Sequence, residues 1–94
     1  MSKVLEVHLD SAALTMGPVL TPDARKFRLW CGGQYTALLS SLADGIDLSF
    51  EAREAVCEFR AEGLDEATRA TVEREFASIA QGATAAGFFW SGPG

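Results

Sequence analysis

Apolar and polar residues alternate near the N-terminus. In the segment KVLEVHL, residues 3–9, Leu5, Val7 and Leu9 fall on one side of an extended chain and polar residues fall on the other. A period of two is typical of a half-buried strand. We therefore predict a strand over residues 3–9. The next segment, 11–20, has no clean periodicity and is predicted to be a loop.

A helix start follows this loop. Thr21 is a good N-cap, Pro22 suits the first helical position, and Asp23 places negative charge at the positive end of the helix dipole. Apolar residues then recur at helical spacing up to residue 43. This pattern predicts a long helix over residues 22–43.

Two adjacent glycines, Gly32 and Gly33, interrupt that pattern. Each costs about 1 kcal/mol relative to alanine inside a helix. We favour one helix in which the glycines let another backbone come close. The alternative is a strand over residues 26–31, with the helix beginning only at Gln34.

The segment DLSFEAREAVCEFRAEG is compatible with either a helix or a strand. Its glutamates, arginines and alanines favour a helix over residues 50–61 that ends at Gly63. Apolar residues also alternate with polar ones over residues 55–61, so the period alone leaves a strand open. We favour the helix on propensity.

The clearest helix lies in LDEATRATVEREFASIAQG. It begins after Asp65 as N-cap and is predicted to end at Gly82. Its apolar face carries Thr68, Val72, Phe76 and Ile79. Together these elements predict a mainly helical α+β fold, with one N-terminal strand, about three helices and an extended aromatic tail over residues 87–94. We expect one domain over residues 1–94.

The tail, GFFWSGPG, carries three adjacent aromatic residues, Phe88, Phe89 and Trp90. A lone strand cannot satisfy its own backbone groups, so the strand at residues 3–9 needs a partner. Aromatic residues favour extended structure, and the tail is the best candidate in this molecule or in a neighbouring one. Because successive side chains of a strand point oppositely, we expect Phe88 or Trp90 to close the core and Phe89 to meet a second protein surface.

Composition and charge limit the kinds of binding partner that we expect. The chain has 94 residues, 48% of them hydrophobic, and a net charge of -5. No apolar run approaches the ~20 residues of a membrane span, and the N-terminus is unlike a signal peptide, so we expect a cytoplasmic protein without a membrane partner. The acidic balance makes nucleic-acid binding unlikely.

The densest group of cations is Arg25, Lys26 and Arg28, beside Phe27 and Trp30. These cations are candidate contacts for a small anion or ligand. A solvated helix face whose aromatic residues point inward explains the same pattern, and we favour that explanation because three cations are far from a nucleic-acid groove.

Few residues in the chain could act as catalytic or metal-binding side chains. His8 is the only imidazole, and Cys31 and Cys57 are the only thiols. Zinc needs four donors, or three and a water, so we expect no metal, no cofactor and no catalytic residue. We expect both cysteines to be reduced core thiols and His8 to be a surface residue.

These patterns favour interaction over catalysis. We predict a regulatory, accessory or inhibitory module that binds a larger protein partner and self-associates, for example as a homodimer. In size and acidity the chain resembles small accessory proteins of bacteria and phages. The predicted interface residues are Phe88, Phe89, Trp90, Trp30 and Tyr35. The alternative is a small-molecule binding protein, or a precursor or carrier whose segment 87–94 is recognised or modified by an enzyme.

Overall fold

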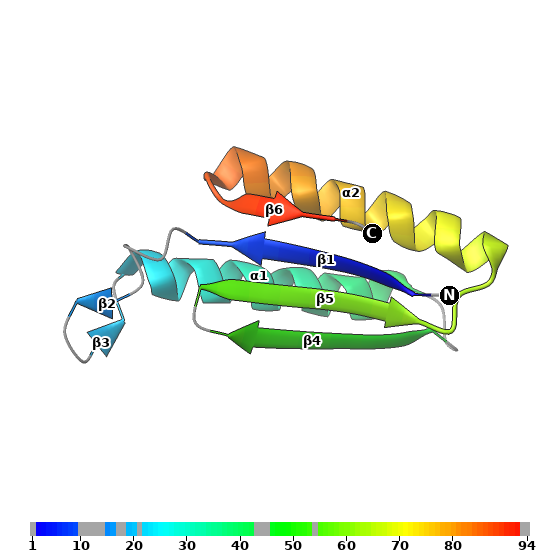
Figure 1. Ribbon diagram of the computed structural model, residues 1–94, viewed down its shortest axis with the longest axis horizontal. Coiled ribbons are helices and arrows are strands. Elements are labelled where there is room, and N and C mark those ends of the chain that lie inside the picture. The colour runs from blue at the N-terminus through cyan, green and yellow to red at the C-terminus, as the bar shows by residue number, and fades with distance from the viewer. Residues whose placement is uncertain are drawn as a thin grey trace.

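A four-stranded antiparallel sheet forms the body of the protein, and two long helices lie against one of its faces (Figure 1). The structure is a computed structural model that describes residues 2–9, 15–16, 19–20, 22–42, 46–53 and 55–92. The elements are β1 (Lys3–His8), β2 (Thr15–Met16), β3 (Val19–Leu20), α1 (Pro22–Ser41), β4 (Asp47–Arg53), β5 (Val56–Glu62), α2 (Glu66–Ala86) and β6 (Phe89–Ser91).

The strands of the sheet follow the order β4-β5-β1-β6, and β2 and β3 form a separate two-stranded sheet. Apart from that small sheet, the chain runs β-α-β-β-α-β, and each of the two β-α-β units is split by a strand of the other. This is the split β-α-β topology, also called ferredoxin-like. Proteins of many unrelated functions share it, so the topology carries no function by itself.

The prediction of a mainly helical fold with one strand and three helices is wrong. The segment 50–61, predicted as a helix, belongs to β4 and β5, which pair in a hairpin with Phe50 opposite Phe59. In β5 alternate residues are fully buried, and the polar residues between them are only partly covered. Burial of one face of a strand therefore overrides the helix propensity of its glutamates, arginines and alanines.

The predictions for residues 3–43 are confirmed only in part. The N-terminal strand is confirmed as β1, which ends at His8. The predicted loop over 11–20 contains the paired β2 and β3, so that prediction is wrong for those four residues. The predicted N-cap at residue 21 lies outside the described residues. The single helix through the glycine pair is confirmed as α1, and the alternative strand over 26–31 is wrong.

The glycine pair of α1 does not serve the predicted purpose. A Cβ atom added at Gly32 or at Gly33 would meet nothing within 4 Å among the described residues. The close approach occurs instead at Gly82 of α2, where a Cβ atom would lie 3.4 Å from Cζ2 of Trp30. Gly82 is therefore a contact point between the two helices and does not end α2.

Replacing Gly33 by alanine is expected to raise the free energy of unfolding by about 1 kcal/mol, because alanine loses less backbone entropy in a helix and meets no obstacle here. Urea unfolding measures the change. The matched control is Gly87→Ala, since Gly87 has a φ of +87°. The same chemical change there should cost about 1 kcal/mol. Two changes of the same sign would contradict the backbone described here.

Both ends of α2 are capped. At its start the side chain of Asp65 accepts from the backbone N–H of Thr68 at 2.9 Å, and Thr68 Oγ1 accepts from the N–H of Asp65 at 2.9 Å. The helix ends at Ala86, where Gly87 in the left-handed conformation donates to the carbonyls of the last turn. This C-cap turns the chain back toward the sheet, so it sets the position of β6.

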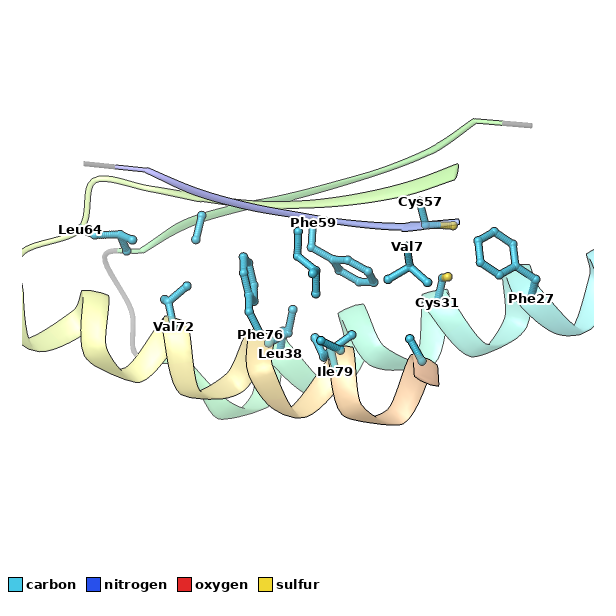
Figure 2. Close-up of a cluster of buried hydrophobic side chains, with 14 residues drawn as sticks. Val7, Phe27, Cys31, Leu38, Cys57, Phe59, Leu64, Val72, Phe76 and Ile79 are labelled. Atoms are coloured by element: carbon cyan, nitrogen blue, oxygen red, sulfur yellow. The ribbon is translucent and has the colours of Figure 1, made fainter. Parts of the chain in front are cut away.

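The core fills the space between the sheet and the two helices, as Figure 2 shows. Strands β1 and β5 contribute one face each, α1 contributes Phe27, Cys31 and Leu38, and α2 contributes Val72, Phe76 and Ile79. Phe59 and Phe76 are fully buried at its centre. The opposite face of the sheet carries partly or fully exposed polar side chains and is not covered by any described element.

Candidate interaction surface

The C-terminal strand β6 forms one edge of the sheet. It pairs antiparallel with β1, with Val7 opposite Trp90 and His8 opposite Phe89. The tail was predicted to pair with the N-terminal strand, in the same molecule or in a neighbour, and the structure shows the pairing within the molecule. Because residues opposite each other share a face, Trp90 lies on the helix side of the sheet and Phe89 on the other side.

Phe88, which precedes β6, packs into the end of the core. Its ring meets the rings of Phe27 and Trp30 edge to face, with centroids 5.0 Å and 5.4 Å away. Its backbone N–H donates to the carbonyl of Ala83 at 2.8 Å. The helix cap and this ring contact together fix the direction in which β6 leaves α2.

Phe89 and Trp90 remain accessible. Phe89 is 66% exposed and Trp90 is 42% exposed. The indole Nε1–H of Trp90 donates to Thr84 Oγ1 at 2.9 Å, and that hydroxyl donates to the carbonyl of Ala80 at 3.2 Å. Trp90 is therefore held against α2 by its polar atom, while much of its ring stays open to solvent.

A hollow of about 420 Å³ lies beside Trp90, between α2 and β6. We call it the α2–β6 groove; its lining residues are Ala77, Ala80, Gln81, Thr84, Trp90 and Gly92. Most of the lining is apolar, and Gln81 and Thr84 supply the polar side chains. The contribution of α2 could not be predicted from the sequence, although its run of small residues from Ala77 onward was a weak signal.

The other predicted interface residues are divided between two places. Trp30 is half-buried between Phe88 and Gly82, so it joins the C-terminal segment to both helices. Tyr35 is also half-buried, but it stacks on Phe50 of β4, with centroids 5.1 Å apart and planes at 17°. The structure therefore brings Trp30 and Phe88 together and places Tyr35 beside the opposite edge of the sheet.

The cations of α1 do not form a single site. Arg25, Lys26 and Arg28 are exposed. Arg25 and Arg28 are three positions apart and lie on neighbouring flanks of the helix, whereas Lys26 lies at least about 100° away from both. Lys26 borders a hollow of about 360 Å³ next to Phe88, and the carboxylate of Asp23 borders the same hollow. An anion would meet one positive and one negative group there.

The two thiols lie between α1 and the sheet (Figure 2), and both are fully buried. The hydrogen bond with Cys57, together with burial, raises the pKa of the Cys31 thiol. A buried neutral thiol is a poor nucleophile, so this pair acts as core packing. Its position agrees with the expectation of two reduced core cysteines.

His8 makes the only Ser-His contact among the described residues, with 3.3 Å between His8 Nε2 and Ser91 Oγ. The pair is exposed on the outer face of the sheet, where water competes for both groups. Within the described ranges, no group of three or more His, Cys, Asp or Glu side chains is arranged to hold a metal ion. None of the described helices combines the length and apolarity that crossing a membrane would need.

The outer face of the sheet is a network of charges. Arg53 lies 3.4 Å from Glu58, 3.8 Å from Glu51 and 3.9 Å from Glu6. Arg60 also contacts Glu58, at 3.2 Å. Carboxylates outnumber guanidinium groups on this face, so it does not attract a phosphate backbone.

Comparisons with protein families, with curated proteins and with solved structures found no match to this chain.

Proposed function

We propose that this chain is a non-catalytic protein-interaction module that binds an extended apolar segment of a larger partner protein along the α2–β6 groove. The observation that carries the proposal is Trp90, which is fixed to Thr84 by a hydrogen bond and still presents an exposed ring at the edge of the sheet. A preorganised, partly exposed tryptophan loses little entropy on binding, and this residue type is enriched among interface hot spots.

The backbone of β6 supports an extended partner. It is an edge strand of three residues, so one side of it offers N–H and C=O groups to another strand. A partner strand added there would place alternate side chains on the two faces of the sheet. One set would enter the groove beside Ala77 and Trp90, and the other would meet Phe89.

A protein segment suits this groove better than a small molecule. The groove is open, and its polar side chains are limited to Gln81 and Thr84. A small ligand needs several converging polar groups to fix its orientation. A peptide obtains its orientation from the main chain of β6. The packing of Phe88 against Phe27 and the pairing of β6 with β1 also weigh against a tail that an enzyme modifies.

The role that follows is regulatory, accessory or inhibitory, because binding without chemistry can only cover, position or hold a partner. The acidic outer face of the sheet, on the side of Phe89, would favour partners that carry basic residues beside the apolar segment. The partner would approach the edge of the sheet that carries β6.

A display library of random twelve-residue peptides tests this function. We expect selection on the full chain to enrich alternating aromatic and aliphatic sequences. The variant Ala77→Arg fills the groove with a charged side chain and should weaken the enriched peptides at least about tenfold. The matched control is Ala70→Arg, which makes the same change at an exposed position of α2 outside the groove.

Two results would overturn the proposal. One is a selection that enriches no peptide family on the folded protein. The other is enriched peptides that bind the Ala77→Arg variant as tightly as the unmodified chain. Circular dichroism on each variant confirms that the fold is retained.

A further inference from the structure

The second edge of the sheet, β4, lies on the side opposite β6 (Figure 1). It is seven residues long and pairs with β5 along its whole length. Within the described part of the chain, no strand pairs with its other side. A long open edge is a template for another strand, and natural proteins usually block it.

This edge lacks the usual protection. Residues 47–53 contain no proline, and the side chains on the helix side are apolar, namely Leu48, Phe50 and Ala52. The charged side chains, Asp47, Glu51 and Arg53, all lie on the outer face. An inward-pointing charge, which would prevent edge-to-edge pairing, is therefore missing.

We propose that the β4 edge pairs with the β4 edge of a second copy of this chain, forming a two-fold dimer with one continuous antiparallel sheet. The pairing is centred on Phe50, so that each strand overlaps the other over its full length. Both helix layers then lie on the same side of the joined sheet. This dimer uses a surface separate from the α2–β6 groove, and it does not depend on the proposed function.

Charge selects this register. With Phe50 on the two-fold axis, Asp47 of each copy lies opposite Arg53 of the other, and Ser49 lies opposite Glu51. A shift by two residues in one direction places Glu51 opposite Glu51, and a shift in the other direction places Asp47 opposite Glu51. Like charges directly opposite each other are destabilising, and opposite charges are stabilising. The strand is therefore complementary to itself in the register that also gives the longest overlap.

The apolar residues beside the edge fit the same arrangement. Tyr35 of α1 stacks on Phe50, so this flank of the helix faces the β4 edge. Leu39 and Leu42 follow at spacings of four and seven residues, which places them on the same flank. Leu39 is 55% exposed, and Leu42 is half-buried. In the dimer the two α1 helices flank the axis, and these side chains become covered.

Sedimentation equilibrium over a range of protein concentrations tests the dimer. We expect the full chain to dimerise, and Asp47→Arg to raise the dissociation constant about tenfold or more, because two attractive pairs become repulsive. Arg53→Asp should act in the same way. The matched control, Glu75→Arg, makes the same charge change as Asp47→Arg on α2, away from this edge, and should leave the dimer intact.

Mixing the two weakened variants separates charge pairing from loss of folding. An Asp47→Arg chain and an Arg53→Asp chain have complementary edges, so their mixture should form a heterodimer at concentrations where neither forms a homodimer. A chain that stays monomeric at millimolar concentration overturns the proposal. So does an Asp47→Arg variant that dimerises as well as the unmodified chain, or a mixture that fails to associate. Ala77→Arg should leave the dimer unchanged. Dimerisation through β4 and peptide binding in the α2–β6 groove can therefore be contradicted separately.

Discussion

Replacing Phe59 by alanine is expected to lower the free energy of unfolding by about 3–5 kcal/mol. Phe59 is fully buried at the middle of β5, opposite Leu5 of β1 and Phe50 of β4. Its ring contacts that of Phe50, with centroids 5.2 Å apart. Truncation leaves a cavity between the sheet and both helices. A domain of this size has only about 5–15 kcal/mol of stability, so much of it would be lost.

Urea unfolding followed by circular dichroism measures this effect. The matched variant Phe59→Leu keeps most of the buried volume and should cost about 1 kcal/mol. If position 59 lay on an amphipathic helix with an exposed side, alanine would cost far less. An alanine variant within 1 kcal/mol of the unmodified chain would therefore contradict the strand at residues 56–62.

Replacing Phe88 by alanine is expected to cost about 2–3 kcal/mol, the second largest effect. The ring is half-buried, makes edge-to-face contacts with Phe27 and Trp30, and seals the end of the core. Its loss should also loosen β6, because the strand follows it directly. Thermal unfolding should show a decrease in Tm of roughly 8–24 °C for a domain of this size.

The neighbouring residue Phe89 provides the control. It has the same side chain one position further on, but it points to the outer face and is 66% exposed. Phe89→Ala should change the free energy of unfolding by less than about 0.5 kcal/mol. Equal effects at the two positions would mean that the segment does not alternate between a buried and an exposed face.

The alternating pattern of β5 is visible in the sequence, but the sequence alone does not decide between a strand and a helix there. Cys57, Phe59 and Ala61 alternate with Glu58 and Arg60 in the way that a strand requires. Glu58, Arg60 and Ala61 are also good helix formers, but helix propensity is a weak preference that tertiary burial overrides. Only the pairing of β5 with β1 and β4 on either side decides between the two.

The role of Gly82 could not be predicted from the local sequence either. Gly82 looked like a helix stop, and it is instead the point at which Trp30, more than fifty positions earlier in the chain, packs against α2. The local pattern contains no trace of that contact. The C-cap falls at Gly87, which a local pattern equally allows.

The candidate site was predictable in part. A lone N-terminal strand needs a partner, and that requirement led to the pairing of β6 with β1. The alternation of side chains along a strand separated Phe88 from Phe89. The hydrogen bond between Trp90 and Thr84 and the groove beside it depend on where α2 crosses the sheet. The open β4 edge could not be predicted while its residues were assigned to a helix.

The position of the C-terminal segment is the central claim, since both the core closure and the α2–β6 groove depend on it. A nuclear Overhauser spectrum of the full chain tests it most directly. We expect contacts between the ring protons of Phe88 and those of Phe27 and Trp30, and backbone contacts between Val7 and Trp90. Random-coil shifts for residues 88–91 without any of these contacts would contradict the claim.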